Sequence, residues 1–201
     1  MRNPYDYYPT PEWCYENLPI DWSQFKTAME PCEGDGRITK FLQSKGMEVT
    51  TCEIRHDKDF LEYGYDFTED HGFDLIFTNP PFSLAQEFIE HSIMLSTTVV
   101  MLLRINFLGS QKRYDFWNQF PPDGMFILSK RPSFTGTGTD ATDYCWVVWD
   151  KTDRTQRGVF FVAPPSKEQS FIAKQLAFTK EELSADSETY QNIILDKTLK
   201  T

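Results

Sequence analysis

The 201-residue sequence has no hydrophobic run long enough to cross a membrane. Its longest apolar stretch, residues 98–103, is far shorter than the roughly 20 residues that a spanning helix needs. The N-terminus also lacks the basic flank and apolar core of a secretory signal peptide. We therefore expect an untargeted cytoplasmic protein, bacterial or from a phage-infected cell, with no membrane partner.

Cysteine and histidine are scarce as well, with four cysteines and three histidines in the chain. The cysteines are Cys14, Cys32, Cys52 and Cys145. They show none of the paired spacings that are typical of zinc sites or disulfide frameworks. We expect reduced thiols in a reducing compartment and no bound metal.

Positive charge is in short supply, because 20 Lys and Arg residues stand against 30 Asp and Glu residues and give a net charge of −10. A nucleic-acid partner normally requires a basic face. Either the positive charge is concentrated locally or the substrate is not a long duplex. The alternative is that the basic side chains are ordinary solvated surface charges. The candidates for a local concentration are Arg104, Lys112, Arg113, Lys130, Arg131, Arg154 and Arg157.

An apolar run at residues 73–77 predicts a buried strand that stops at Asn79-Pro80-Pro81-Phe82. The two prolines lack backbone donors and end the strand, and Pro80 keeps Asn79 out of the helical region. Asn79 therefore lies on a stiff corner at the carboxyl end of the strand. Ser83 and Gln86 have the spacing of a capping box, which predicts that a helix starts there.

This corner offers two hydrogen-bond acceptors side by side, the Asn79 side-chain carbonyl and the Pro80 backbone carbonyl. Two acceptors suit an exocyclic amine with two hydrogens, and Phe82 could stack on the ring that carries the amine. The alternative interpretation is a proline turn before a helix, with no ligand.

A second candidate site follows the strand predicted at residues 25–29. The loop Glu30-Pro31-Cys32-Glu33-Gly34-Asp35-Gly36 has two glycines that allow a tight turn and close approach to a ligand. The third glycine of a phosphate-binding fingerprint is absent, and the loop carboxylates would repel pyrophosphate. A cationic ligand fits better, although a turn without a ligand remains the alternative. Glu53, after a strand at residues 48–52, is placed to accept ribose hydroxyls.

Three motifs together resemble one enzyme family. Asn79-Pro80-Pro81-Phe82 resembles the catalytic tetrapeptide of S-adenosylmethionine-dependent adenine-N6 DNA methyltransferases. Glu30-Pro31-x-x-Gly34-x-Gly36 is similar to their cofactor loop, and Tyr8-Pro9-Thr10-Pro11 looks like their Tyr/Phe-x-Thr-Pro element. The resemblance covers residues 5–150, and the stretches around Arg104, Arg131-Pro132-Ser133-Phe134 and residues 143–146 resemble small bacteriophage members.

The resemblance implies roles for individual residues. Asn79, Pro80, Pro81 and Phe82 would be catalytic, and Tyr8, Thr10 and Pro11 would close over the methionine part of S-adenosylmethionine. Glu30, Pro31, Gly34, Gly36, Glu53 and Asn79 would also hold this cofactor. The adenine of the cofactor would contact Asp66-Phe67, for which Asp59-Phe60-Leu61 is a rival. We prefer Asp66, because Asp59 lies only six residues after Glu53 and leaves little chain for entry into a third strand.

The target side of the site is predicted from residues after the Asn79 corner. Phe134 lies in a glycine-rich loop that could fold over an extruded base, on the face opposite Phe82. An ordinary surface hairpin loop is the alternative for Phe134. The phosphate candidates are Arg104, Lys112, Arg113 and Arg131.

The alternating pattern of strands and helices indicates an α/β fold. Further strands are predicted at residues 97–103, 124–129 and 144–149, with an edge strand at 158–163. The family resemblance implies a Rossmann-like class I methyltransferase domain, with a seven-stranded, mostly parallel sheet and an antiparallel last hairpin strand. We assign it to residues 1–165, followed by a polar helical tail at 166–201. No room remains for a separate target-recognition domain, so a homodimer could supply further contacts.

The expected function is transfer of a methyl group from S-adenosylmethionine to the N6 amine of an adenine that is flipped out of DNA. One alternative is a methyltransferase that acts on RNA or on protein glutamine, which the acidic net charge favours. Another is a catalytically idle protein that binds the cofactor or DNA and blocks restriction. The presence of Asn79, Glu30, Gly34 and Gly36 argues against this last interpretation.

Overall fold

The computed structural model describes residues 8–64, 72–136 and 138–166. The chain divides into two units, Met1–Pro164 and Pro165–Thr201, and the second lies almost wholly outside the described residues. The helices predicted in the polar tail fall in that undescribed part. No helix in the described ranges is long and apolar enough to cross a membrane.

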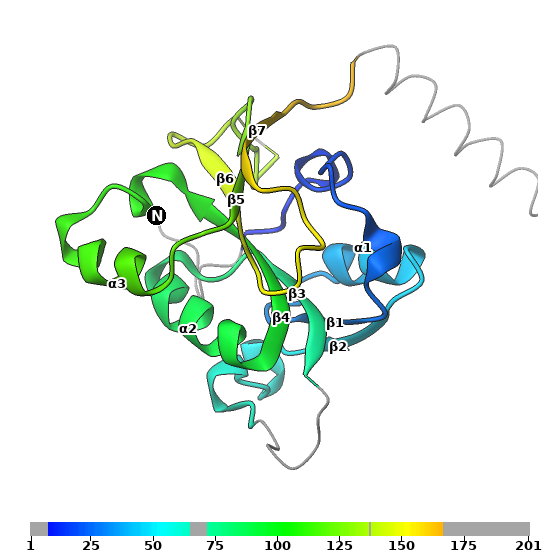
Figure 1. The fold of residues 1–201 in the computed structure, drawn as a ribbon. Helices are drawn as coiled ribbons and strands as arrows, with labels where there is room; N and C mark the ends of the chain where they lie inside the picture. Colours follow the sequence, from blue (N-terminus) through cyan, green and yellow to red (C-terminus); the bar gives the residue numbers. More distant parts are fainter. Residues whose placement is uncertain (1–7, 65–71, 137, 167–201) are drawn as a thin grey trace, which may run out of the picture. The chain divides into compact units, whose positions relative to one another are not determined.

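A seven-stranded mixed sheet forms the centre of the first unit (Figure 1). The strand order is β2-β1-β3-β4-β6-β5-β7. Only β6 runs antiparallel to its neighbours, β4 and β5, while the other pairs are parallel. This arrangement confirms the predicted fold. The strands are β1 (Thr27–Glu30), β2 (Glu48–Thr51), β3 (Phe73–Thr78), β4 (Ser96–Arg104), β5 (Gly124–Leu128), β6 (Tyr144–Asp150) and β7 (Gly158–Val162).

One strand of the prediction is missing from the described residues. The third strand expected between Glu53 and Phe73 is not formed in residues 54–64, where the chain makes 3-10 turns at Ile54–His56 and Phe60–Glu62. Each turn begins with an acidic side chain, Glu53 or Asp59, that accepts a backbone N–H two residues on and bends the chain. The count of seven is reached through β7, which pairs with β5 at the far edge.

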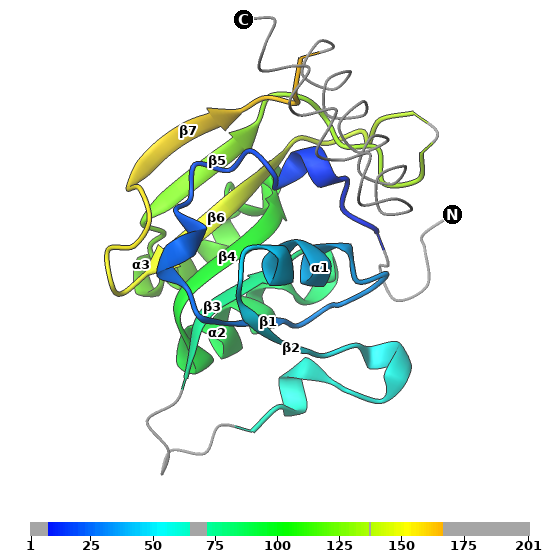
Figure 2. The ribbon, with the colours of Figure 1, turned by 90° about the vertical axis from the view of Figure 1, so that its right-hand side faces the viewer.

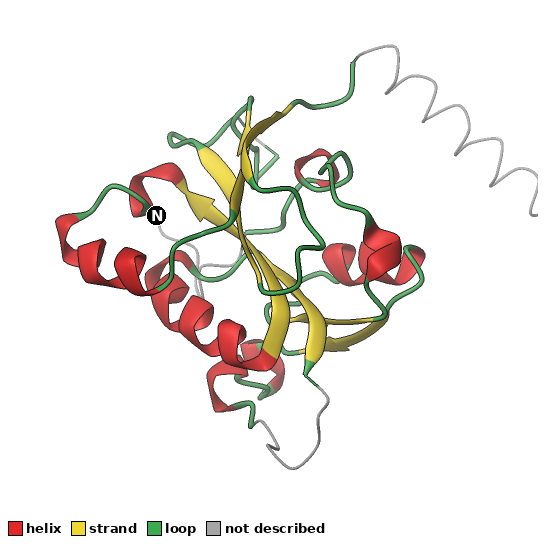
Figure 3. Cartoon of the chain, in the orientation of Figure 1, coloured by secondary structure: helices red, strands yellow, loops and turns green. Residues whose placement is uncertain are grey.

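Helices cover both faces of the sheet (Figure 3). The helix α1 (Arg37–Ser44) packs on one face, and α2 (Ala85–Leu95) and α3 (Tyr114–Gln119) pack on the other. Gly46, at a φ of 89°, ends α1 as predicted. The α-helix α2 begins at Ala85, two residues after the predicted start at Ser83, because a 3-10 turn at Phe82–Leu84 comes first, and the Gln86 side chain donates to Glu90.

The N-terminal segment crosses the same sheet face as α1 (Figure 2). Cys14 and Tyr15 are buried, and the indole Nε1 of Trp146 on β6 donates to the Cys14 carbonyl at 2.6 Å. Trp146 also stacks on Phe77 of β3, with ring centroids 4.3 Å apart. These contacts fix the segment to the sheet and bring residues 8–10 to the carboxyl end of β3.

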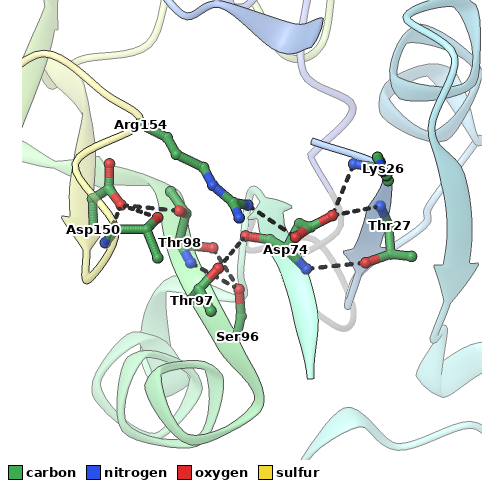
Figure 4. A network of polar contacts seen from close by, with 9 residues as sticks. Lys26, Thr27, Asp74, Ser96, Thr97, Thr98, Asp150 and Arg154 are labelled. Atoms are coloured by element: carbon green, nitrogen blue, oxygen red, sulfur yellow. Dashed lines mark hydrogen bonds and ion pairs between the residues drawn. The ribbon is translucent and has the colours of Figure 1, made fainter. Parts of the chain in front are cut away.

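Polar residues at the opposite end of β3 and β4 form closed hydrogen-bond networks (Figure 4). Asp74 accepts from the backbone N–H groups of Lys26 and Thr27 and pairs with Arg154 at 2.9 Å. Asp150, only 4% exposed, accepts five hydrogen bonds. Its donors are the Thr98 hydroxyl and the backbone N–H and hydroxyl groups of Thr152 and Thr155. These networks tie the strands to the chain between β6 and β7.

Candidate active site

A cavity of about 500 Å³ opens at the carboxyl ends of β1 and β3. The chain goes from β1 outward to β2 and then returns to place β3 on the other side of β1, so the strand order reverses between β1 and β3. Open α/β sheets bind ligands at such a switch point, because the loops after the two strands diverge there. The volume lies in the usual range for small-molecule sites.

Glu30 ends β1 and is completely buried. Its Oε1 accepts the Thr78 hydroxyl at 2.5 Å and the Cys32 N–H at 2.9 Å. Its Oε2 is buried without a hydrogen-bond partner. Pro31 and Cys32, the next residues, line the cavity. An unpartnered carboxylate oxygen beside a cavity is costly unless a ligand or a proton satisfies it.

The protonation of Glu30 follows from this environment. Burial raises the pKa of the Glu30 carboxyl to about 8, although the hydrogen bonds from Thr78 and Cys32 act in the opposite direction. The carboxyl is therefore mostly protonated at neutral pH. Because Oε1 already accepts two donors, the proton belongs on Oε2. A cation that reaches Oε2 would replace this proton.

The glycine loop turns as the sequence predicts, with Gly34 at a φ of 61° and Gly36 at 76°. The Gly34 N–H donates to Oε2 of Glu53 at 2.8 Å and so joins the loop to the end of β2. Gly36 precedes the first residue of α1. The loop thus forms one wall of the cavity, to which Glu33, Gly34 and Asp35 contribute.

Glu53 is more heavily engaged than the sequence suggested. Its Oε1 accepts the backbone N–H and the Nε of Arg55, and its Oε2 accepts the Gly34 N–H and the Arg55 Nη2. Burial alone would raise the pKa of Glu53, but these hydrogen bonds outweigh it and hold the pKa below its usual value. Four donors fill the four acceptor positions of a carboxylate. A ribose diol must therefore displace part of the Arg55 side chain to reach Glu53.

Asn79 lies at the end of β3 in a fixed orientation. Its Nδ2 donates to the Tyr8 carbonyl and to the Thr10 hydroxyl, both at 3.0 Å. Since a carbonyl can only accept, the amide nitrogen must face Tyr8 and the oxygen must point elsewhere. That oxygen, Oδ1, is buried and has no hydrogen-bond partner. The N-terminal segment thus holds Asn79, a residue of the cavity wall, so that its Oδ1 is left as an unpartnered acceptor.

Four aromatic residues next to this corner, Tyr8, Phe82, Phe134 and Tyr144, make up what we call the aromatic cluster. The Tyr8 ring contacts Phe82 at a centroid distance of 6.1 Å and Phe134 at 5.8 Å. Tyr144 contacts the same two rings at 5.5 Å and 5.2 Å. The structure therefore brings the two predicted stacking residues, Phe82 and Phe134, into one cluster, and it adds two rings that were not predicted to stack on a base.

The predicted phosphate contacts have different surroundings. The guanidinium of Arg104 lies over the Phe82 ring, 4.3 Å from its centroid. Arg113 lies over Phe107 at 4.0 Å, and Lys112 is exposed on the neighbouring 3-10 turn. Arg131 forms an exposed ion pair with Asp143 at 2.8 Å. Three of these four cations therefore contact an aromatic ring or an acid. Among the described residues, Lys112 shows no such contact.

The cavity includes part of the predicted residue set. Asp66 and Phe67 lie outside the described residues, whereas their rivals Asp59 and Phe60 line the cavity. Pro11, Glu30, Gly36 and Pro80 do not line it, nor do Phe82, Phe134 and the four phosphate candidates. The predicted cofactor and catalytic residues that do line the cavity are Tyr8, Thr10, Pro31, Gly34, Glu53, Asn79 and Pro81.

Two arginines in the cavity wall, Arg37 and Arg55, were missed by the sequence analysis. Arg37 pairs with Asp35, and Arg55 pairs with Glu53. In both cases the acid precedes the arginine by two residues in a loop, and this spacing is the signal that could have indicated them. Within the described ranges, no three His, Cys, Asp or Glu side chains are grouped so as to hold a metal ion.

Comparison with known proteins finds structures with a similar fold but no matching sequence family. No protein-family model matches the chain, and no curated protein sequence matches it. A solved structure from Pyrococcus horikoshii, described as a candidate RNA methyltransferase, is 14% identical with a TM-score of 0.53, over 72% of this chain and 86% of that one. The methyltransferase subunit of a type I restriction-modification system from Streptococcus thermophilus is 16% identical with a TM-score of 0.52.

The chain has a Rossmann-like α/β fold, which it shares with these two methyltransferase structures. The match covers 87% of this chain and 53% of the Streptococcus thermophilus subunit, so the chain spans about half the length of that protein. At these identities the likeness concerns the fold alone. The chemistry of the site has to be argued from the residues of this chain.

Proposed function

We propose that this protein transfers a methyl group from S-adenosylmethionine to the N6 amine of adenine in DNA. The observation that carries the proposal is the Asn79 side chain, whose Nδ2 is held by Tyr8 and Thr10 while its Oδ1 stays unpartnered at the end of β3. A buried, unsatisfied acceptor in a fixed orientation is suited to an N–H donor of a substrate.

The residues of the cavity fit S-adenosylmethionine, which would supply an electrophilic methyl group. Glu33 and Asp35 put negative charge on the cavity wall, and the buried Glu30, which directly precedes Pro31 and Cys32 of that wall, has an unpartnered Oε2 that could serve a positive charge. Ile54 and Phe60 provide apolar surface for an adenine ring. Glu53 accepts ribose hydroxyls once Arg55 yields at least one of its hydrogen bonds.

The target amine is positioned by the corner after β3. Asn79 Oδ1 and the Pro80 carbonyl accept the two amine hydrogens, which draws the nitrogen toward tetrahedral geometry and orients its lone pair. Phe82 stacks on the ring of the base, which has left the duplex to reach the corner. Positioning and electrostatics account for the rate, and no cysteine nucleophile is involved.

Transfer of labelled methyl to unmethylated genomic DNA, followed by nucleoside mass spectrometry, tests the proposal. N6-methyladenine is the expected product. The variant Asn79→Ala should lower the rate by at least about 100-fold and still bind S-adenosylhomocysteine in calorimetry. Asn118→Ala, which removes an exposed asparagine on α3, is the matched control. Full activity of Asn79→Ala contradicts the proposed role of Asn79.

The net charge of −10 favours a second candidate, methylation of RNA or of a protein glutamine. The aromatic cluster beside Asn79 argues for a planar ring over a glutamine side chain, because flat surfaces stack on bases. Assays with total RNA and with protein extract, run beside the DNA assay, separate these substrates. Turnover on any of them excludes a catalytically idle binding protein.

A further inference from the structure

We propose that Arg104 is a positioning residue for the target base, which acts through Phe82, and that it does not contact a phosphate. The proposal rests on the function given above, because it concerns how Phe82 is held beside Asn79. It replaces the role that the sequence suggested for this arginine.

The first observation is the placement of the guanidinium. Arg104 ends β4, the neighbour of β3, and its guanidinium carbon lies 4.3 Å from the centroid of Phe82. An arginine over a ring face is attracted by the ring quadrupole, with about 0.5–2 kcal/mol depending on desolvation. One face of Phe82 is therefore covered by Arg104, which restricts the orientations that this ring can adopt.

The second observation is a hydrogen-bond chain with a defined direction. Arg104 Nε donates to the Tyr144 hydroxyl at 3.2 Å, and that hydroxyl donates to Asp140 Oδ2 at 2.8 Å. Tyr144 is completely buried, and burial raises the pKa of its phenol, so the hydroxyl keeps its proton and donates it. The Arg104 guanidinium thus has its Nε occupied and its face against a ring.

The series of hydrogen bonds continues into the loop that carries Phe134. Asp140 accepts from the Thr142 N–H through Oδ1, and its own N–H donates to the Pro132 carbonyl at 2.9 Å. Tyr144 also contacts both Phe82 and Phe134 through its ring. Arg104 is therefore connected to both stacking residues, to Phe82 directly and to Phe134 through Tyr144 and Asp140.

These contacts favour the positioning role. A phosphate that bound through Nε would leave the Tyr144 hydroxyl without its donor, so a phosphate contact that keeps the present arrangement would have to use the two Nη groups. Lys112 is exposed and can reach a phosphate at no such cost. The salt dependence of DNA binding should therefore come from cations such as Lys112, while Arg104 should affect the rate of transfer.

The test compares Arg104→Met, which keeps a long apolar side chain, with Lys112→Ala. Binding of a fluorescein-labelled DNA is measured by anisotropy over a salt series, and kcat and KM are measured separately. For Arg104→Met we expect an unchanged slope of log K against log salt and a kcat that is about 10-fold to 100-fold lower. For Lys112→Ala the slope should fall by about 0.9.

Tyr144→Phe gives an independent test, because it removes only the hydroxyl that Arg104 contacts. It should lower kcat in the same sense as Arg104→Met and leave the salt slope unchanged. Arg104→Lys keeps the charge without the planar guanidinium and should not restore kcat. A slope lowered by about 0.9 in Arg104→Met with unchanged kcat would overturn the proposal. If the unaltered protein shows no transfer to DNA, the proposed function fails instead, and the salt slopes still show whether Arg104 contacts phosphate.

Discussion

The two ends of the sheet hold buried carboxyl groups in opposite states. At the amino end of β4, Asp150 accepts five hydrogen bonds, and these outweigh the effect of burial and lower its pKa. At the carboxyl end of β1, Glu30 accepts two hydrogen bonds on one oxygen and none on the other, and burial raises its pKa to about 8. Both side chains are buried, so burial alone does not distinguish them.

The difference lies in how completely each acceptor is satisfied. A closed network such as that of Asp150 stabilises the fold and leaves nothing for a ligand. An unpartnered oxygen such as Asn79 Oδ1 costs stability in the free protein, because it has lost water without gaining a donor, whereas Glu30 Oε2 holds a proton that a cation can replace. This contrast is the reason we propose a binding role for the polar atoms at the switch point of the sheet.

The largest effect on stability should come from opening the closed network. Asp150→Ala leaves the Thr155 N–H and four further donors without their acceptor. We expect the free energy of unfolding to fall by about 3–5 kcal/mol, as for removal of one partner of a buried charged network. Denaturant titration followed by circular dichroism measures it. A loss below about 1 kcal/mol would show that the network does not stabilise the fold as described.

The corresponding change at the open end, Glu30→Gln, should weaken ligand binding and remove a pH dependence of folding stability. It removes the group that accepts a cation, and we expect S-adenosylhomocysteine to bind at least about tenfold more weakly, as judged by calorimetry. The Glu30 pKa is raised on folding, so the stability of the free protein falls as pH rises from about 4.3 to about 8. Glu30→Gln should lack this slope, and an identical slope in both proteins would contradict the assignment.

Asp74 offers a smaller, pH-dependent test of the closed end. Burial acts to raise the pKa of Asp74, but the hydrogen bonds from Arg154, Lys26 and Thr27 lower it. A lowered pKa contributes stability that is present above the unfolded value, about 3.9, and lost as pH falls through the folded value. Asp74→Asn should reduce stability at neutral pH by about 1–2 kcal/mol and flatten the acid limb of the curve. Thermal unfolding over a pH series measures both effects.

The smallest effect is expected for Arg55→Gln, which frees acceptor positions on Glu53. The Arg55 side chain donates to both oxygens of Glu53, where we expect ribose hydroxyls to bind. Its removal should strengthen binding of S-adenosylhomocysteine, by less than about tenfold. An analogue without ribose hydroxyls is the control and should gain nothing. Weaker binding of the parent compound would indicate that Arg55 supports the ligand directly.

Much of the fold could be predicted from the chain. The apolar run of β3 with its proline stop and the glycine turn before α1 are local signals, whereas the antiparallel direction of β6 was implied only by the family resemblance. The start of α2 could not be placed, because a 3-10 turn after the prolines competes with the Ser83 capping pattern. Residues 54–64 hold no strand because two acidic side chains cap turns there, and the rest of the interval before β3 in which the third strand was expected lies outside the described residues.

The candidate site was predictable by residue type and less so by contact. Asn79, Glu53 and Gly34 lie at the cavity as expected from their positions after strands. A short acid–arginine spacing hints at the Glu53–Arg55 pair, but no local pattern shows that Tyr8 orients Asn79 or that Arg104 covers Phe82. These contacts join residues on separate elements or depend on side-chain conformation, so they become visible only in three dimensions.

The central claim is that unpartnered oxygens at the switch point of the sheet form the site. Proton release on ligand binding tests this claim most directly. Titration of S-adenosylhomocysteine at neutral pH, in two buffers of different ionisation enthalpy, gives the number of protons released. Because Glu30 is mostly protonated in the free protein, binding of a cation at Oε2 should release close to one proton, and Glu30→Gln should release none. Equal release by both proteins, or no release by either, would contradict the account.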